Sequence, residues 1–484
     1  MVEEVRALEP KALWNNFADL NAVPRGSKKE ERVIEFAKNF GEGLGLKTII
    51  DEVGNVIIKK SASAGMEGKP IIALQSHLDM VHQKNADTDF DFDTQGIDMY
   101  VDGDWVKAKG TTLGADNGIG IAAIMALLES TDIAHPPLEA LFTIDEETGM
   151  TGAIGLKGGF LDAKILLNLD TEDDDELTIG CAGGIDVTAE GAYTEDELEG
   201  DFVTYKIEMK GLTGGHSGVD IQLGRGNANK LMNRFFTALA ANIDLAINSI
   251  DGGGLRNAIP RESSAVVSVL RSDLEQFNSM AAEFNEMLSN EFATTDANAE
   301  LVATSTGKVS TRLNADFQSQ LLKGIYACPN GIYRMSPEIE GLVQTSNNLA
   351  RVLVKEGAYE ILCLTRSTSE TEKQDEVNSI KAAFELMGAT VSSGGSYPGW
   401  EPKPEAAIIK LMQGLYTEMF KEEAHVSAIH AGLECGILGT HYPEVEMISF
   451  GPNIYGAHSP DERAQISSVQ KFWGYLLETL KRIE

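Results

Sequence analysis

Residues 71–79 read Ile-Ile-Ala-Leu-Gln-Ser-His-Leu-Asp, an apolar run that ends in a histidine and a carboxylate. Short apolar runs that alternate with helical patterns are typical of buried strands in an α/β sheet. Three further runs end in similar residues: 138–144 before Asp145-Glu146-Glu147, 164–169 before Asp170, and 447–450 ahead of His458. Ligands of such sheets bind at the carboxyl ends of the strands. The sequence therefore predicts an enzyme with metal-ligand residues gathered at one edge of a sheet.

The composition is that of a two-domain protein without a membrane segment. The chain has 484 residues, more than one hydrophobic core usually holds, and its hydrophobic content is 43%. It has no run of about 18 uncharged apolar residues. The first residues are acidic and lack the pattern of a signal peptide. Four cysteines lie far apart with no Cys-x-x-Cys pair, which favours buried thiols in a reducing cytoplasm.

The net charge of −34 excludes two kinds of partner. Nucleic acids and anionic membranes bind basic surfaces, so we expect neither to bind this chain. Carboxylates that converge can still hold divalent cations. We interpret the acidic runs at 87–93 and 170–176 as solvated loops, with the exception of Asp170.

The periodicity predicts a second domain inserted into the first. Residues 11–21, 28–40 and 119–128 have helical patterns, and 48–59 is typical of a strand pair. After Gly184 the pattern changes to two α+β units, each a split β-α-β sheet with helices on one face. Their predicted strands are 202–209, 265–270, 348–354 and 359–364, and their predicted helices are 227–240, 274–288, 317–326 and 370–387. The Gly- and Pro-rich residues 392–400 indicate the crossing back. We therefore predict a catalytic domain formed by residues 1–184 and 399–484, with residues 185–398 as an inserted lid or substrate-binding domain.

Five residues form a predicted ligand set: His77, Asp116, Glu147, Asp170 and His458. This set fits two cations about 3.5–4 Å apart, each with one histidine and one terminal carboxylate, and with Asp116 as the bridge. Mixed histidine and carboxylate ligands favour Zn²⁺, with Mn²⁺ or Co²⁺ as alternatives. Adjacent Glu146 and Glu147 cannot both point the same way, so one can ligate while the other acts as a base.

Asp79 is two residues beyond His77, so on an extended segment both side chains point the same way. A metal-binding imidazole usually donates its second N–H to a carboxylate or carbonyl. Asp79 is placed for that supporting role. The apolar helix that starts near Asp116 also has an N-terminus whose backbone N–H groups favour a bound anion.

These motifs resemble the M20 family of metallopeptidases. The resemblance rests on Ser-His-Leu-Asp at 76–79, Gly-Ala-Asp-Asn-Gly at 114–118, Asp-Glu-Glu-Thr-Gly at 145–149, Asn-Leu-Asp at 168–170 and Gly-Ala-His at 456–458. Their order and spacing, and the inserted domain, fit the family across nearly the whole chain. Residues 75–81, 213–218 and 430–436 resemble the dipeptidases of this family. The resemblance implies a zinc-peptidase-like catalytic domain, a mixed sheet with helices on both faces, and an α+β lid of two ferredoxin-like units.

The resemblance also implies roles for individual residues. Glu146 is then the general base, Asp79 orients His77, and Asp116 bridges the cations with a cis peptide to Asn117. In the inserted domain, His216 is then the donor to the developing oxyanion. Asn257 and Arg366 resemble lid residues that hold the substrate carbonyl or carboxylate, and we assign His430 to the side-chain pocket.

The resulting hypothesis is a metal-dependent dipeptidase with two divalent ions per chain. A hydroxide between the cations attacks the peptide bond of an Xaa-His or other unblocked dipeptide, and Glu146 takes its proton. An N-acyl-amino-acid deacylase is the alternative, although deacylases of this family usually carry a lid of one unit. A non-catalytic peptide-binding protein is a further alternative, but binding alone needs no base at Glu146. We also expect a homodimer through the inserted domain, with His216 supplied either within the chain or across the interface.

Overall fold

In the computed structural model, which describes residues 2–484, the chain divides into two compact units. Unit 1 consists of the chain up to Gly180, Trp400–Ala428 and Leu433–Glu484. Unit 2 consists of Cys181–Gly399 and the short segment Ile429–Gly432. The residues predicted as an insertion, 185–398, lie within unit 2, and the segment from 429 to 432 is an addition that the sequence pattern did not indicate.

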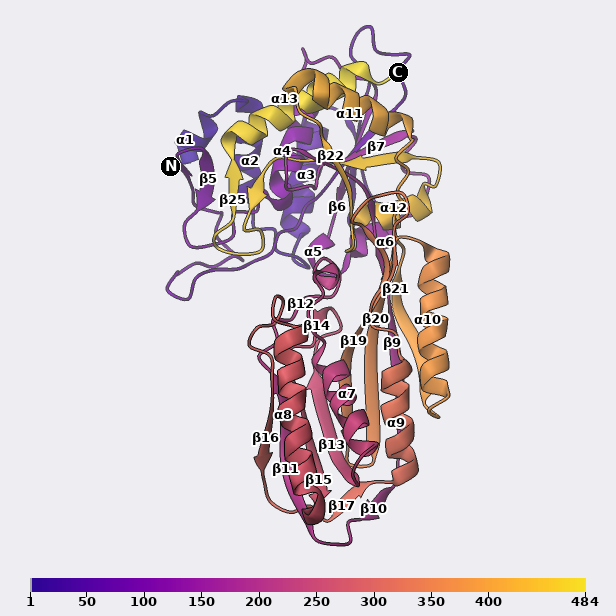
Figure 1. The fold of residues 1–484 in the computed structure, drawn as a ribbon. Coiled ribbons are helices and arrows are strands. Elements are labelled where there is room, and N and C mark those ends of the chain that lie inside the picture. Colours follow the sequence, from indigo (N-terminus) through magenta and orange to yellow (C-terminus); the bar gives the residue numbers. More distant parts are fainter. Residues whose placement is uncertain (1) are drawn as a thin grey trace. The chain divides into compact units, whose positions relative to one another are not determined.

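Unit 1 is built on a mixed eight-stranded sheet (Figure 1). The order is β1 (Lys47–Ile50), β2 (Val56–Lys60), β6 (Leu138–Thr143), β3 (Ile72–His77), β7 (Ile165–Asn168), β23 (Glu446–Ser449), β8 (Glu176–Cys181) and β22 (His425–Ile429). The central strands β6, β3, β7 and β23 are parallel to one another. Every residue of β3 and β6 is buried, so helices and loops cover both faces. The mixed sheet that the family resemblance implies is therefore confirmed.

Helices surround this sheet. They are α1 (Val2–Arg6), α2 (Lys11–Asn21), α3 (Glu31–Gly43), α4 (Ala115–Glu129), α5 (Glu146–Gly149), α6 (Thr151–Gly155), α11 (Ala407–Phe420), α12 (Glu434–His441) and α13 (Ile466–Arg482). A smaller sheet joins β24 (Ile454–Tyr455), β25 (Arg463–Gln465), β5 (Trp105–Ala108) and β4 (Met99–Asp102). Helix α3 starts later than predicted because Lys28 has a positive φ of 65°. Helix α4 is almost entirely buried, as its apolar sequence indicates.

Unit 2 contains one continuous antiparallel sheet. Its order is β16 (Glu300–Ser305), β11 (Phe202–Lys210), β15 (Ser263–Leu270), β13 (Leu245–Gly253), β19 (Val343–Lys355), β20 (Ala358–Ser367), β9 (Gly183–Ala192) and β21 (Thr390–Tyr397), with β18 (Gly331–Met335) paired to β19. Helices α7 (Ala228–Ala240), α8 (Leu274–Glu291), α9 (Ala315–Ala327) and α10 (Glu370–Glu385) pack on one face (Figure 1). The predicted α+β repeats are thus joined edge to edge by the β13–β19 pair, and a single hydrophobic cluster spans both.

Short elements complete unit 2. They are β10 (Glu195–Glu197) with β17 (Thr311–Leu313), β12 (Gly215–His216) with β14 (Ala258–Ile259), and the 3₁₀ turns η1 (Ile221–Leu223) and η2 (Arg271–Asp273). The interpretation of residues 392–400 as a crossing was wrong over most of its length, because Thr390–Tyr397 is strand β21. This strand lies at the sheet edge and shifts register between Gly394 and Tyr397. An edge strand tolerates glycines because only one side needs to pair.

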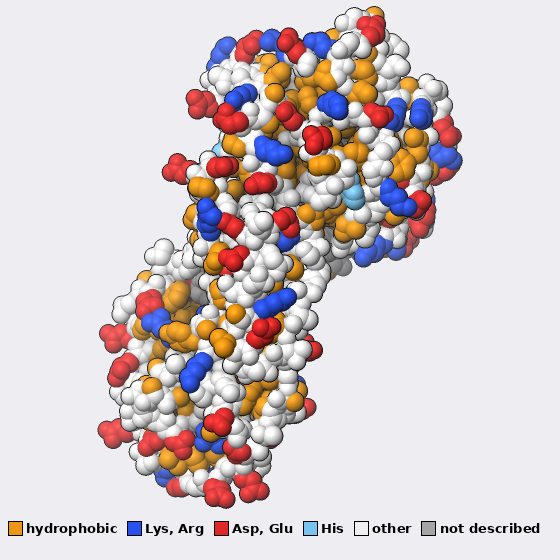
Figure 2. Space-filling view, turned by 90° about the vertical axis from the view of Figure 1, so that its right-hand side faces the viewer, with side chains coloured by type: hydrophobic (Ala, Val, Ile, Leu, Met, Phe, Trp, Pro, Cys, Tyr) orange, Lys and Arg blue, Asp and Glu red, His pale blue; other side chains and the backbone are white. Residues whose placement is uncertain are grey.

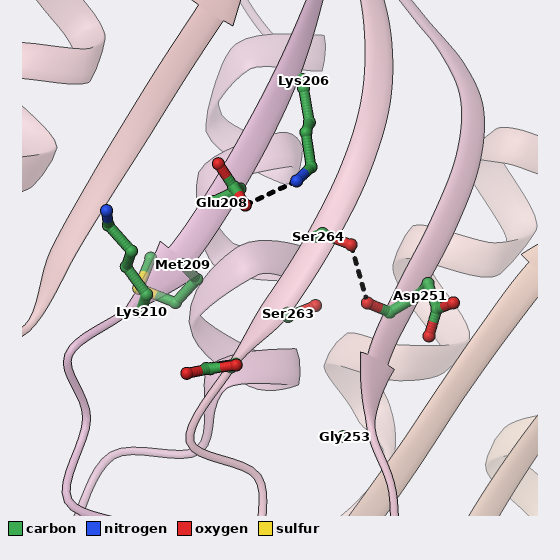
Figure 3. Close-up of a pocket in the computed structure, with 9 residues that line it drawn as sticks. Lys206, Glu208, Met209, Lys210, Asp251, Gly253, Ser263 and Ser264 are labelled. Carbon is green, nitrogen blue, oxygen red and sulfur yellow. Dashed lines mark hydrogen bonds and ion pairs between the residues drawn. The ribbon is translucent and has the colours of Figure 1, made fainter.

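The sheet of unit 2 has a polar face opposite its helices. Lys206, Glu208 and Lys210 alternate with buried Ile207 and Met209, so they face away from the hydrophobic core. They line an open pocket of about 390 Å³ in which Lys206 pairs with Glu208 at 2.6 Å (Figure 3). No predicted site residue lines this pocket within the described chain. Its mixed charges are those of an ordinary solvated sheet face.

On the face that Figure 2 shows, acidic and basic side chains are interspersed. Across residues 2–484, the structure contains no helix that is both long enough and apolar enough to span a bilayer. All four cysteines are buried, and none of them forms a disulfide.

Candidate metal centre

The ends of the parallel strands of unit 1 deliver the predicted ligand residues to one place. His77 is the last residue of β3, Glu146 and Glu147 begin α5 just after β6, and Asp170 follows β7. Asp116 lies in the first turn of α4, where the peptide to Asn117 is cis, as the resemblance implied. His458 arrives on the loop between β24 and β25.

Asp116 stands between the two histidines. Its Oδ1 lies 3.1 Å from His77 Nε2, and its Oδ2 lies 3.2 Å from His458 Nε2. Asp170 approaches His77 Nε2 at 3.4 Å, while Glu147 approaches His458 Nε2 at 2.8 Å. Two groups of potential ligand atoms result, His77–Asp116–Asp170 and Asp116–Glu147–His458, with Asp116 common to both. One carboxylate shared by two such groups fits a pair of divalent cations.

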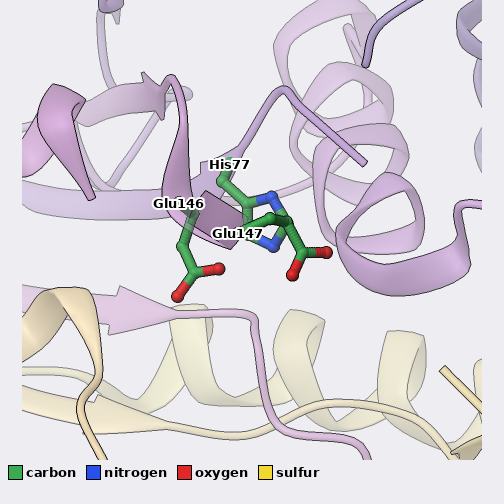
Figure 4. A group of neighbouring side chains, drawn as sticks. All are labelled: His77, Glu146 and Glu147. Carbon is green, nitrogen blue, oxygen red and sulfur yellow. The ribbon is translucent and has the colours of Figure 1, made fainter. Parts of the chain in front are cut away.

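Glu146 differs from its neighbour Glu147. It belongs to neither group that contains Asp116, although its carboxylate lies close to His77. The two glutamate carboxylates lie on different sides of the His77 ring (Figure 4). Glu147, in contrast, contacts His458 directly. Glu146 thus forms a third group with His77 and Glu147 but stays outside the two groups that share Asp116.

Asp79 holds His77 and the two glutamates in place through hydrogen bonds. Its Oδ1 accepts the backbone N–H of Glu146 at 3.0 Å, and its Oδ2 accepts the N–H of Glu147 at 3.3 Å and the hydroxyl of Ser27 at 2.8 Å. His77 Nδ1 lies 3.4 Å from Oδ1 and 3.2 Å from the backbone oxygen of Asp79. Although burial opposes ionisation, the contact with His77 and these hydrogen bonds lower the pKa of Asp79 to about 2. Asp79 therefore fixes both the imidazole and the glutamate backbone.

The centre contains more carboxylates than basic side chains, a composition that favours the binding of cations. Burial raises the pKa of Glu146 well above its usual range and also raises the pKa values of Glu147 and Asp170. The hydrogen bonds that His458 donates to Asp116 and Glu147 raise the pKa of His458 to about 11. Burial favours neutral His77, but the carboxylates around it raise its pKa well above the ordinary value. Protons on the imidazoles thus compensate an excess of carboxylates, and divalent cations on the same atoms would replace those protons.

The N-terminus of α4 is occupied by Glu462, which the sequence pattern did not single out. Its Oε2 accepts the N–H groups of Leu113 at 2.7 Å and Gly114 at 2.9 Å, and its Oε1 accepts those of Ala115 at 2.7 Å and Asp116 at 3.2 Å. The predicted anion at this helix start is therefore a carboxylate of the chain itself. Glu462 fixes the backbone of the bridging residue. No local motif marks it, because its partners lie almost 350 residues earlier.

Arg25 is a second supporting residue that the sequence did not reveal. It is 1% exposed, and its Nη1 donates to the carbonyl oxygens of Leu78 at 3.1 Å and Asp79 at 3.0 Å. Its Nη2 donates to the carbonyl oxygen of Gly114 at 2.5 Å. Burial lowers the pKa of Arg25 to about 10, so it remains charged at neutral pH. Arg25 joins the segment after β3 to the start of α4.

In unit 2, the predicted residues gather around the loop at 215–218. The N–H groups of Gly218 and Val219 donate to His216 Nδ1 at 3.2 and 3.3 Å. Burial and the charge of Arg366 lower the pKa of His216, so the ring is neutral near pH 7. Because Nδ1 accepts hydrogen bonds, the hydrogen of the neutral ring is on Nε2. His216 therefore presents an N–H donor.

Arg366 and His430 lie near this loop. Arg366 Nη2 is 3.5 Å from His216 Nε2, and its Nη1 donates to the hydroxyl of Tyr397 at 2.7 Å. His430 Nε2 lies 2.7 Å from Ser346 Oγ, and burial lowers the pKa of His430 to about 3. Asn257 is exposed, and its backbone oxygen accepts the N–H of Ser217 at 2.8 Å. Tyr397 is a further member of this cluster, and no sequence motif marks it.

Comparison with known proteins gives full-length matches. A model described as a peptidase dimerisation domain matches residues 207–296. The cytosol non-specific dipeptidase of Escherichia coli (strain K12) is 42% identical over 482 residues, covering 100% of this chain and 99% of that protein. The crystal structure of aminoacylhistidine dipeptidase from Vibrio alginolyticus matches with a TM-score of 0.94 at 41% identity, over 99% of this chain and 98% of that one. Aminopeptidase PepT from Bacillus cereus ATCC 10987 has the same fold, with a TM-score of 0.57 at 15% identity over 98% of this chain and 99% of that one.

Proposed function

This chain belongs to the M20 family of metallopeptidases, and we propose that it is a dipeptidase that hydrolyses Xaa-His and other unblocked dipeptides. The substrate class rests on the names of two relatives that match it from end to end. The observation that carries the mechanism is Asp116, whose two oxygens face one histidine each.

We propose that each chain binds two divalent cations. His77, Asp116 and Asp170 would hold one, and Asp116, Glu147 and His458 would hold the other. The donors favour Zn²⁺, with Mn²⁺ and Co²⁺ as alternatives. When bound, such a pair polarises the substrate carbonyl and makes a water molecule more acidic.

Glu146 is the proposed general base. It lies outside the two ligand groups that share Asp116, and burial raises its pKa well above its ordinary value, which makes the carboxylate a stronger base. Its carboxylate takes a proton from the attacking water and returns it to the leaving amine. Asp79 holds the Glu146 backbone and so sets the direction from which this carboxylate acts.

The residues of unit 2 are proposed to bind the substrate. His216 is neutral with its hydrogen on Nε2, so it can donate to an oxygen that becomes negative during the reaction. Arg366 offers a planar cation, held by Tyr397, to the free carboxylate of a dipeptide. Asn257 is assigned to the substrate carbonyl and His430 to the side-chain pocket.

We further propose a cytosolic homodimer. The match of residues 207–296 to a peptidase dimerisation domain supports assembly through unit 2. The name of the Escherichia coli relative and the absence of disulfides among the four cysteines support the location. Light scattering at micromolar concentration should give twice the mass of one chain, and the mass of a single chain would contradict the dimer.

The function is tested with three substrates: an Xaa-His dipeptide, a tripeptide and an N-acetyl amino acid. We expect hydrolysis of the dipeptide, loss of activity after chelation, and recovery with about two equivalents of Zn²⁺, Mn²⁺ or Co²⁺ per chain. Preference for the N-acetyl amino acid would instead indicate a deacylase. Full activity in the chelated protein would refute the metal centre.

A further inference from the structure

A row of buried polar side chains crosses the four parallel strands of unit 1. Thr143 on β6, Gln75 on β3, Asn168 on β7 and Ser449 on β23 are each at most 2% exposed. Gln75 Nε2 donates to Thr143 Oγ1 at 3.1 Å, and Asn168 Nδ2 donates to Gln75 Oε1 at 2.5 Å. Ser449 Oγ donates to Asn168 Oδ1. Side chains thus link four neighbouring strands in addition to the backbone ladder.

This row immediately precedes the residues of the metal centre along the strands. Gln75 comes two residues before His77, Thr143 two residues before Asp145, and Asn168 two residues before Asp170. Side chains two apart on a strand point to the same face, so Gln75 and His77 share one face of β3. The proposed ligands His77 and Asp170 thus follow row members by two residues, and Glu146 and Glu147 follow Thr143 by three and four. A displacement of one of these strands would therefore also move the ligand or base residue that follows it.

Glu434 joins the row from outside the sheet. It is the first residue of α12 and is 1% exposed. Its Oε2 accepts from Gln75 Nε2 at 2.7 Å and from Thr143 Oγ1 at 2.7 Å, so one oxygen bridges β3 and β6. These two strands lead to His77 and to the Glu146–Glu147 pair.

The protonation of Glu434 suits this position. Burial raises its pKa to about 8, so the group is largely neutral at pH 7 and avoids the cost of a buried charge. The sequence 430–436 carried part of the family resemblance, but no step of the proposed reaction uses Glu434.

We propose that Glu434 is a positioning residue that fastens the ends of β3 and β6, so that His77 and Glu147 keep the spacing that two cations require. This inference rests on the proposed metal centre. Without the acceptor, Gln75 and Thr143 lose a common partner, and the two strand ends lose the side-chain bridge between them. In the metal-free protein, the ligand side chains would then be held less firmly in the positions that bind the cations.

The test compares Glu434→Gln with Glu434→Leu. Gln keeps one oxygen that can accept both hydrogen bonds, whereas Leu has a similar size and accepts none. Glu139→Leu is the matched control, because Glu139 is a buried carboxylate at the other end of β6, four residues or roughly 13 Å from Thr143. Each chelator-treated variant is titrated with Zn²⁺ by calorimetry, and its melting temperature is measured in parallel. The kcat and KM of each variant for an Xaa-His dipeptide are then measured at saturating Zn²⁺.

We expect Glu434→Leu to bind Zn²⁺ roughly 10–100-fold more weakly, the usual effect of losing a group that orients metal ligands. Its kcat should fall while KM stays within about threefold, and Glu434→Gln should restore both kcat and metal affinity. Glu139→Leu should lower the melting temperature but leave metal affinity unchanged. A Glu434→Leu protein with normal metal affinity and kcat would overturn the proposal, as would a Gln variant as impaired as the Leu variant. Metal titration needs no substrate, so failure of the dipeptidase assignment would be recognised separately.

Discussion

The adjacent residues Glu146 and Glu147 should respond in opposite ways to the same chemical change. Replacement of either by Gln keeps size and polarity but removes the negative charge and the ability to accept a proton. The backbone N–H bonds of both residues to Asp79 do not involve the changed side chains. Each variant is therefore a control for the local structure of the other.

The structure sets the expected magnitudes. Glu146 lies outside the two ligand groups that share Asp116, so Glu146→Gln should retain about two cations per chain. Its kcat should fall by roughly 10²–10⁴-fold, the usual scale for a lost acid–base group, which corresponds to about 2.7–5.5 kcal/mol. Glu147 contacts His458 at 2.8 Å within one of these groups. Glu147→Gln should therefore lose one cation on dilution, and excess metal should partly restore its activity.

The assay is dipeptide hydrolysis at several Zn²⁺ concentrations, with bound metal measured on the same samples by atomic absorption. Activity of Glu146→Gln should not depend on added metal, whereas activity of Glu147→Gln should rise with it. If Glu146→Gln lost its metal and recovered on addition, the two roles would be reversed. Equal metal dependence in both variants would refute the distinction drawn from the geometry.

Three further predictions concern supporting residues. Arg25→Met should lower the free energy of unfolding by about 3 kcal/mol, because three buried carbonyl oxygens each lose a donor. Denaturant titration measures this loss, and Arg234→Met, which breaks an exposed ion pair, is the control that should change stability little. Asp79→Asn in chelated protein should cost about 2 kcal/mol at pH 7, since folding lowers the pKa of Asp79 from 3.8 to about 2. That contribution is fully present above pH 3.8 and is lost as the pH falls toward 2. The free energies of unfolding of variant and wild type should therefore converge as the pH falls, and a constant difference down to pH 2 would contradict the prediction. Tyr397→Phe removes the hydroxyl that accepts a hydrogen bond from Arg366. It should raise KM for a dipeptide roughly 2–10-fold and leave kcat unchanged. The control substrate is the dipeptide amide, which lacks the free carboxylate, and its KM should not change.

The central sheet was predictable because its signals are local. The apolar runs that became β3, β6, β7 and β23 are each four to six residues long and are bounded by polar or turn residues. The residues that follow these strands reach the same edge once the strands are parallel. The sequence alone therefore predicts that His77, Glu147 and Asp170 are neighbours. Helix α4 was equally clear from its continuous apolar sequence.

The limits of this prediction also have physical causes. Residues 390–397 have the glycines of a turn, yet they form β21 because β9 offers them a free edge. Local composition cannot reveal whether such an edge exists. The same holds for the single sheet of unit 2, since the pairing of β13 with β19 joins segments about 100 residues apart.

The sequence by itself determined which residues can act as ligands, because that property belongs to the side chain and to its place at a strand end. Only the tertiary structure decided what holds those ligands in place. Glu462 at the start of α4, Arg25 between two loops and Glu434 beneath β3 and β6 all bind groups distant in the sequence. A buried polar group needs a partner, but the identity of that partner depends on how the whole chain folds. Such partners leave no periodic pattern from which they could be read.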